Sequence, residues 1–247
     1  MSSTPRPLSG ETRASGPTVP SPNATTPATA GVGLPGMLHT LGLAEKFAKV
    51  HAENLFGGDV SASGGGSDLV QTRVIRHEIP LLLQKLAVRT ILDAPCGDCF
   101  WMKEVDLPVE SYIGIDIVPD LVGQNQQRFG GARVSFQCLD LVAGGLPRAD
   151  LIFSRDCLVH LSLSDGQKIL ANFKRSGATY LLATTFVEQT GNVELDCHFW
   201  RPLNMQLAPF HFPPPRELIN EGCTEASHRF ADKSLGLWQL ADIATPD

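Results

Sequence analysis

The sequence Thr90-Ile91-Leu92-Asp93-Ala94-Pro95-Cys96-Gly97-Asp98-Cys99-Phe100-Trp101 carries the strongest structural signal in this chain. A short apolar run ends in the acid Asp93, a tight turn follows, and the segment 100–105 is compatible with a helix. A strand, a turn and a helix in this order are typical of the opening unit of a nucleotide-binding α/β domain. Gly97 has no side chain, so the backbone of the turn can approach a ligand closely there.

The bulk composition restricts the classes of function. The chain has 247 residues, 43% apolar content and a formal net charge of −6, which suits one domain of ordinary size with additional segments. There is no long Lys/Arg run, so we expect no nucleic-acid partner. No apolar run approaches the roughly 20 residues of a membrane helix, so we expect no membrane partner either. The first residues lack an apolar leader, and the six cysteines are expected to be reduced, which together predict a cytoplasmic protein.

Residues 1–35 are rich in Ser, Thr, Pro, Ala and Gly and are predicted to be a disordered segment, because they cannot bury enough apolar surface to offset their ordering entropy. Residues 36–247 are predicted to form one domain. A helical pattern begins at Met37 and ends at Phe56. The Gly/Ser-rich segment 61–67 is either a linker or a backbone-rich lip over a ligand site.

Strands and helices are expected to alternate through the middle of the chain. Asp68 and Gln71 fit an N-cap pair for a helix that runs to about Leu86, with a kink or break at Pro80. Ser164 and Gln167 fit the same pattern for a later helix. The other expected elements are strands at 111–116, 133–139, 150–154 and 179–186 and a helix at 119–129. Such alternation predicts a parallel sheet with right-handed crossovers.

Residues 187–222 interrupt this alternation and are predicted to be an aromatic, proline-rich insertion that shapes the substrate side. Arg201, Asn204 and His211 lie in it, and they either line a pocket or satisfy loop backbone. The segments 223–230 and 235–243 are predicted to pair as a final hairpin.

The order of these features resembles the class I S-adenosylmethionine-dependent methyltransferases over roughly residues 60–247. The most specific part of the resemblance is the spacing of three acids, Asp93, Asp116 and Asp140, each of which ends or directly follows a strand. The resemblance implies a Rossmann-like sheet of seven strands, mostly parallel, with helices on both faces and an antiparallel last strand. It also implies S-adenosyl-L-methionine as the cofactor and methyl transfer as the reaction.

The family's cofactor-binding residues are carried over to matching positions. The resemblance implies that Asp93 and the backbone of Cys96 and Gly97 lie against the methionine part of the cofactor. Asp116, with Ile117 beside it, would accept both ribose hydroxyls, and Asp140, with Leu141 beside it, would flank the adenine. The residues that would hold the cofactor are Asp93, Cys96, Gly97, Asp116, Ile117, Asp140 and Leu141.

The turn departs from the family's usual three alternating glycines, because Pro95, Gly97 and Cys99 stand at these positions. Only Gly97 needs to be bare if the other two residues adopt negative φ. Cys96 and Cys99 form a C-x-x-C pair, for which a redox or metal role is the alternative to two thiols in a loop. Because no second C-x-x-C exists for zinc, no metal site is predicted.

The segment after the fourth strand is expected to border the substrate, because the side chains that follow strands of an open α/β sheet line its ligand crevice. Asp156 and His160 lie four residues apart and could share one face of a short helical turn. They are the candidates for a general base, while Trp101 is predicted to pack in the core or in the wall of the cofactor site.

The sequence therefore predicts methyl transfer to an oxygen or nitrogen of an unidentified small-molecule or peptide acceptor. Two alternatives remain at this point. One is a methyltransferase-like scaffold that binds without turnover. The other is a nicotinamide-dependent oxidoreductase, although the sequence lacks G-x-G-x-x-G.

Overall fold

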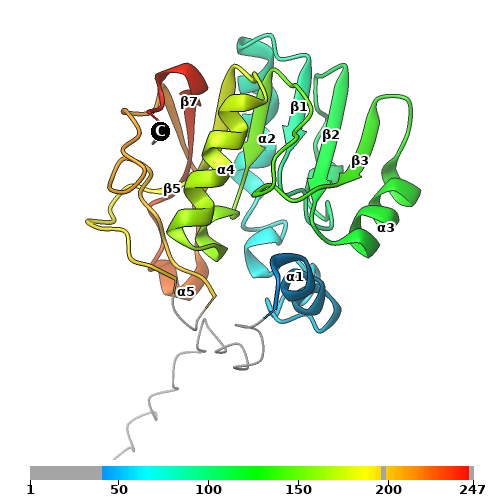
Figure 1. Cartoon of the computed structure of the whole chain (residues 1–247), viewed down its shortest axis with the longest axis horizontal. Helices are drawn as coiled ribbons and strands as arrows, with labels where there is room; N and C mark the ends of the chain where they lie inside the picture. Colours follow the sequence, from blue (N-terminus) through cyan, green and yellow to red (C-terminus); the bar gives the residue numbers. More distant parts are fainter. Residues whose placement is uncertain (1–40, 196–198, 245–247) are drawn as a thin grey trace, which may run out of the picture.

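The computed structural model describes residues 41–195 and 199–244. Within these ranges seven strands form one sheet in the order β3-β2-β1-β4-β5-β7-β6 (Figure 1). The neighbours among β1 to β5 pair in parallel, whereas β7 is antiparallel to both β5 and β6. The predicted fold, including the antiparallel last strand, is thereby confirmed. The strands are β1 (Thr90–Asp93), β2 (Ser111–Asp116), β3 (Val134–Cys138), β4 (Leu151–Ser154), β5 (Tyr180–Phe186), β6 (Glu217–Asn220) and β7 (Lys233–Gln239).

Helices cover both faces of the sheet. They are α1 (Leu43–Ala52), α2 (Arg73–Lys85), α3 (Pro119–Phe129), α4 (Leu163–Arg175) and the short α5 (Glu225–His228). The buried side chains of α2 join one hydrophobic cluster, and those of α4 join the other. In Figure 1, α4 crosses in front of the sheet and α1 lies beyond the arrowheads of β1 and β2. This position of α1 matters for function, because it places the helix over the carboxyl edge of the sheet.

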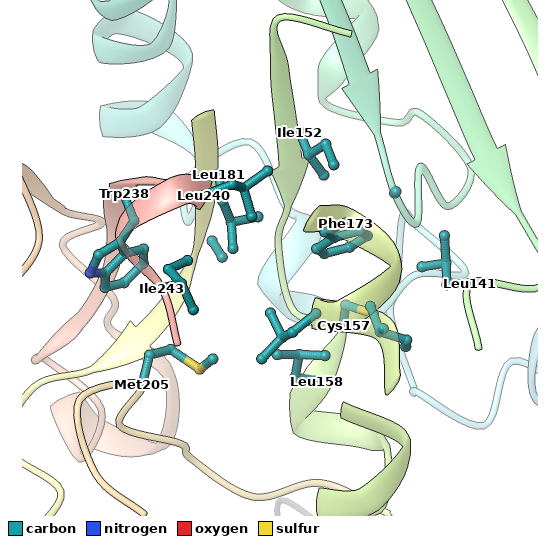
Figure 2. Close-up of a cluster of buried hydrophobic side chains, with 14 of the residues drawn as sticks. Leu141, Ile152, Cys157, Leu158, Phe173, Leu181, Met205, Trp238, Leu240 and Ile243 are labelled. Atoms are coloured by element: carbon teal, nitrogen blue, oxygen red, sulfur yellow. The ribbon is translucent and has the colours of Figure 1, made fainter. Parts of the chain in front are cut away.

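The period-2 alternation of the strands divides the core into two layers. In β1, Ile91 belongs to the cluster on the α2 side and Leu92 to the cluster on the α4 side. Figure 2 shows the α4-side cluster, in which Phe173 of α4 packs with residues of the central strands and of the chain's last strand. Trp238 is buried here, and its indole N–H donates to the carbonyl of Pro213 at 2.8 Å. Apolar burial on both faces fixes the register of the central strands.

Two predicted helix starts are corrected by the structure. The N-cap of α4 is Ser162, whose Oγ accepts from the backbone N–H of Asp165 at 3.0 Å, so the capping pair lies two residues before the predicted one. Helix α2 begins at Arg73, and Asp68 instead accepts from the N–H of Val70 in a preceding turn. Of the kink or break predicted at Pro80, the break is ruled out, since α2 continues through this residue.

Two further segments differ from their predicted structure. The crossover from β1 to β2 contains one 3₁₀ turn, Met102–Glu104, and not the helix expected at 100–105. The final hairpin consists of β6 and β7, so its first strand lies inside the segment predicted as insertion, and residues 223–230 form turns and α5. Residues 1–35 and the predicted helix start at Met37 lie outside the described residues. Among the described residues, no helix combines the length and apolar character that crossing a membrane requires.

Candidate functional site

A cavity opens at the carboxyl ends of the parallel strands and encloses about 1140 Å³, part of which is open to solvent. This is the position where open α/β sheets bind ligands. All seven residues predicted to hold a cofactor line it, although they come from three separate chain segments. They are Asp93, Cys96, Gly97, Asp116, Ile117, Asp140 and Leu141.

Asp116 is anchored by backbone N–H groups from two segments. Its Oδ2 accepts from Gly97 and its Oδ1 from Val118, each at 3.1 Å. Burial raises the pKa of this carboxyl, and the two N–H donors act in the opposite direction. Gly97 has φ +54°, in the region that favours glycine, and an added Cβ would lie 2.5 Å from Oγ of Ser63. The turn therefore needs glycine at this position both for its conformation and for its close neighbour.

Asp93 is almost fully buried, at 3% exposure, and still lines the cavity. The hydroxyl of Tyr112 donates to its Oδ2 at 2.5 Å. Burial raises the pKa of Asp93 to about 7, even though the hydrogen bond from Tyr112 lowers it. Its charge consequently changes near neutral pH, unlike that of an ordinary aspartate.

Cys99 stands in the left-handed region at φ +53°, so the condition of negative φ is not met at this position. A non-glycine residue held there costs about 1–3 kcal/mol unless its surroundings stabilise it, and Cys99 is buried in the α2-side cluster. Both Cys96 and Cys99 line the cavity. Within the described ranges, no group of three or more His, Cys, Asp or Glu residues is placed to hold a metal ion.

The Gly/Ser-rich segment 61–67 packs on the turn through Asp98. The carboxylate of Asp98 accepts from the hydroxyl and backbone groups of the segment: from Ser61 Oγ at 2.9 Å, from Ala62 N at 3.1 Å and from Ser63 Oγ at 3.1 Å. Ala62, Ser63 and Ser67 line the cavity. Of the two interpretations of this segment, the geometry favours the lip over the linker.

Replacing Asp98 by Ala should therefore release this lip. We expect roughly tenfold weaker binding of S-adenosylhomocysteine, measured by calorimetry, together with faster proteolysis within 57–67, because the segment loses its hydrogen bonds to a charged acceptor, each of which contributes about 1.5–3 kcal/mol net. Asp59→Ala is the matched control, since Asp59 is an exposed acid of the same loop region. Equal protease sensitivity of the two variants would contradict the lip.

Helix α1 supplies residues that the sequence analysis did not single out. Phe47, Val50 and His51 line the cavity, and Phe56, shortly after the helix, does so too. His51 is close enough to Asp116 to lower the pKa of that carboxyl against the larger effect of burial. The amphipathic pattern of 43–52 predicts a helix, but it does not indicate that the helix docks over the strand ends.

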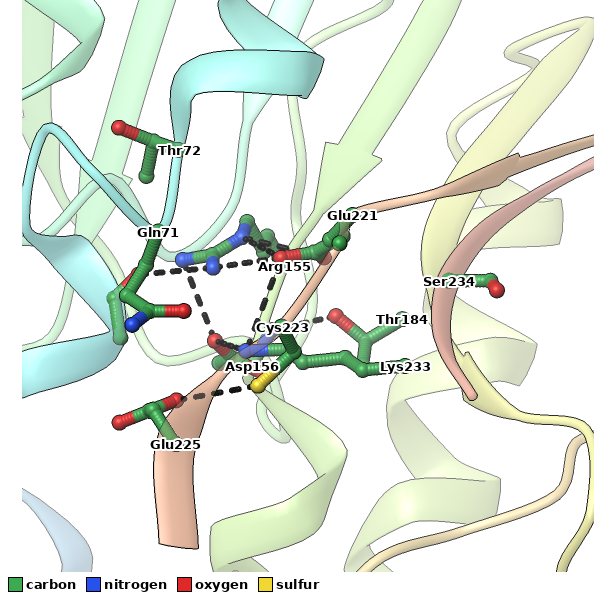
Figure 3. A network of polar contacts seen from close by, with 12 residues as sticks. Gln71, Thr72, Arg155, Asp156, Thr184, Glu221, Cys223, Glu225, Lys233 and Ser234 are labelled. Atoms are coloured by element: carbon green, nitrogen blue, oxygen red, sulfur yellow. Dashed lines mark hydrogen bonds and ion pairs between the residues drawn. The ribbon is translucent and has the colours of Figure 1, made fainter. Parts of the chain in front are cut away.

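At the wall of the cavity lies a largely buried network of four charged side chains (Figure 3), which we call the charge cluster: Arg155, Asp156, Glu221 and Lys233. Arg155 donates to Glu221 at 2.7 Å and to the carbonyl of Gly66 at 2.8 Å. Lys233 donates to Oδ2 of Asp156 at 2.6 Å. Two cations and two anions balance one another, which buried charges require. The cluster joins the residues after β4 to the terminal hairpin and to the lip.

The two residues predicted as general-base candidates, Asp156 and His160, lie in different surroundings. Asp156 lines the cavity and His160 is not among the described residues that do. Asp156 has φ +52° and precedes the 3₁₀ turn Leu158–His160, so the two residues do not share a helical face as predicted. Burial alone would raise the pKa of Asp156, but Lys233 and Arg155 hold it well below its usual range. Asp156 is therefore a permanent anion and a poor proton acceptor.

His160 is held by its own neighbours. Its Nδ1 lies 2.7 Å from the carbonyl of Phe199, to which it donates, and its ring packs against both Phe56 and Phe199, which also stack on each other. Burial lowers the pKa of His160, which keeps the imidazole neutral at physiological pH. Through these contacts, His160 connects Phe56, which follows α1, to Phe199.

Of the three polar residues singled out in the insertion, Arg201 and Asn204 satisfy loop backbone, whereas His211 does not line the cavity. The guanidinium of Arg201 donates to the carbonyls of Leu158, Val159 and Leu161 at 2.7–3.1 Å. Asn204 donates to the carbonyl of Gln189 at 3.1 Å. Trp101, in contrast, lines the cavity and packs edge-on against Phe153, as predicted for a wall residue.

Comparison with known proteins agrees with this geometry. Residues 91–177 match the family model described as a methyltransferase domain. The structure is similar to N-methyltransferase NodS from Bradyrhizobium japonicum WM9 in complex with S-adenosyl-L-homocysteine, with a TM-score of 0.56, 15% identity, and coverage of 80% of this chain and 99% of that chain. It is also similar to 1,6-didemethyltoxoflavin-N1-methyltransferase from Burkholderia thailandensis, with a TM-score of 0.53, 16% identity, and coverage of 87% and 94%. No curated protein matches the sequence.

The fold and the strand-end cavity thus define a Rossmann-like methyltransferase architecture. Residues 91–177 match a methyltransferase domain, and the chain has the fold of the S-adenosylmethionine-dependent methyltransferases compared above, in agreement with the predicted enzyme class and cofactor. The domain match favours this class over the nicotinamide-dependent alternative.

Proposed function

We propose that this protein transfers a methyl group from S-adenosylmethionine to an oxygen or nitrogen atom of a small-molecule acceptor or of an inserted peptide side chain. The observation that carries this proposal is the convergence of Asp93, Gly97, Asp116 and Asp140 on one cavity at the strand ends. A reducing compartment such as the cytoplasm suits the five cysteines of the described ranges, which are free.

The cofactor's three parts would be held by successive strand ends. Asp93 and the Gly97 turn would bind the methionine part, Asp116 the ribose hydroxyls and Asp140 the adenine. When bound, S-adenosylmethionine supplies an activated methyl group on its sulfonium, so the protein's task is to bind and orient. Orientation alone contributes up to about 7–11 kcal/mol in favourable cases.

Asp156 would orient the acceptor. Its Oδ2 is occupied by Lys233 and Arg155, while its Oδ1 is buried and has no partner within the described residues. A buried acceptor atom without a partner is costly, and an N–H or O–H of the acceptor would satisfy it. Because its pKa is held low, Asp156 would accept this hydrogen bond without taking the proton, which leaves to solvent.

The proposal is tested by incubating the purified protein with isotopically labelled S-adenosylmethionine and a cell extract, followed by mass spectrometry of the labelled products. We expect one labelled acceptor and formation of S-adenosylhomocysteine. Binding of the cofactor with no labelled product from any extract would instead support the scaffold without turnover.

The variant Asp156→Asn then distinguishes a role of Asp156 in orienting the acceptor from a role in binding the cofactor. We expect methyl transfer to fall about 10–100-fold, because a charge-assisted hydrogen bond becomes a neutral one, while affinity for S-adenosylhomocysteine stays within threefold. Asp165→Asn, in the first turn of α4 and outside the cavity lining, is the control and should keep full activity. Unchanged turnover in Asp156→Asn would remove the acceptor role.

A further inference from the structure

We propose that Tyr112, inside β2, is a positioning residue for the cofactor: its hydroxyl holds one oxygen of the Asp93 carboxyl and so keeps the other oxygen available to the ammonium group of the cofactor's methionine part. This inference rests on the proposed function and deepens it, because it names a residue away from the cavity lining that controls how the site responds to pH.

The geometry starts from the sheet register. Asp93 ends β1, and β2 runs beside it in parallel, with Ile91 paired to Tyr112 and Asp93 paired to Gly114. The hydroxyl of Tyr112 therefore reaches Asp93 from two residues upstream on the neighbouring strand, at 2.5 Å. The ring is fixed edge-on against Phe136, with centroids 5.9 Å apart. Tyr112 is 5% exposed, so water does not compete for this hydrogen bond.

The direction of the hydrogen bond follows from the chemistry. Burial raises the pKa of Tyr112 well above its ordinary value, so the phenol keeps its proton and donates at every working pH. A donor favours the charged form of the carboxyl that accepts from it. Asp93, in the middle of a buried site, therefore ionises more readily with Tyr112 than it would without it.

Other groups around Asp93 act on the same equilibrium. Asp116 at the end of β2 opposes ionisation of Asp93, whereas Arg155 after β4 favours it. From the turn, Cys96 and Cys99 lie close to the phenol, with Sγ of Cys99 3.7 Å from its oxygen. Within this set, Tyr112 is the neutral group that donates to Asp93, so its loss changes the ionisation of Asp93 without removing a charge.

The experiment measures the dissociation constant of S-adenosylhomocysteine by calorimetry between pH 5.5 and 8.5. In the wild type, we expect affinity to rise as pH rises through about 7, since the carboxylate form of Asp93 binds the ammonium group. In Tyr112→Phe, the midpoint should move upward by about one pH unit, which weakens binding about tenfold near pH 6.5 and leaves it within threefold at pH 8.5.

Two variants make the outcome decisive. Tyr180→Phe changes the chain's other tyrosine and should reproduce the wild-type profile. Asp93→Asn should bind weakly with a flat profile, and it keeps the test valid if Tyr112→Phe does not fold. The inference would be overturned if either Tyr112→Phe or Asp93→Asn kept the wild-type midpoint. It would also be overturned if Tyr112→Phe lost the same affinity at every pH. A wild-type protein that binds no S-adenosylhomocysteine at any pH would instead refute the proposed function.

Discussion

Asp116→Asn is expected to weaken binding of S-adenosylhomocysteine by at least about 100-fold. Two ribose hydroxyls on one carboxylate make two charge-assisted hydrogen bonds, each about 1.5–3 kcal/mol, and about 1.4 kcal/mol corresponds to a factor of ten. The amide also brings a donor against the N–H of Gly97 or of Val118, both of which now donate to the carboxylate. The loss should appear in calorimetric titration at pH 7.5.

Asp120→Asn is the matched control, because Asp120 lies four residues later in the first turn of α3 and is exposed. It should bind within twofold of the wild type. Should Asp116→Asn bind as tightly as this control, the ribose assignment would have to be given up, and with it the main support for the orientation of the cofactor in the cavity.

Glu221→Gln is expected to lower the free energy of unfolding by about 3–5 kcal/mol, the range found when one partner of a buried ion pair is removed. Glu221 is 2% exposed and receives two nitrogens of the Arg155 guanidinium, at 3.1 Å and 2.7 Å from its Oε2. The amide leaves the charge cluster with two cations and one anion in a buried environment. Chemical denaturation followed by circular dichroism measures the change.

Glu217→Gln provides a control from β6, the strand that Glu221 directly follows. Glu217 pairs with Lys85 at 2.6 Å, but the two side chains are 34% and 65% exposed. Surface pairs of this kind contribute at most about 1 kcal/mol. If the free energy of unfolding falls by less than about 1 kcal/mol in both variants, the buried charge cluster contributes no more to stability than a surface ion pair.

The carboxyl-edge site could be predicted because it follows from strand order. Each of Asp93, Asp116 and Asp140 ends or directly follows an apolar run, and parallel strands bring their carboxyl ends to one edge. Local sequence was sufficient for this prediction, since an apolar run followed by an acid can be recognised without knowing which distant residues it contacts. The same holds for Pro119 as the first residue of α3.

The charge cluster could not be predicted, because its pairs join residues far apart in sequence. Arg155 and Glu221 are separated by 66 positions, and Asp156 and Lys233 by 77. Each residue alone has the appearance of a solvated charge. Only the antiparallel pairing of β6 with β7, which the sequence placed several residues too late, brings them together.

Tyr112 was missed although a signal existed. A single phenol in the apolar run of β2, next to a strand that ends in an acid, is a polar group that needs a partner once buried. Register decides which partner it finds, and a shift by one residue would turn the ring to the other face. The errors at Ser164 and Asp68 have a similar origin, since several residues nearby can cap a helix and tertiary packing selects one.

The bond from Arg155 to the carbonyl of Gly66 has a consequence for protein engineering. A version of the chain shortened before β6 would retain every strand-end carboxylate and still lack the counter-ions contributed by Glu221 and Lys233. Its arginine would then be drawn toward water, and the glycine-rich segment that it clamps would lose its anchor. A minimal fragment must therefore keep β6 and β7 with Glu221 and Lys233, because these two residues neutralise the charges of Arg155 and Asp156 at the cavity wall.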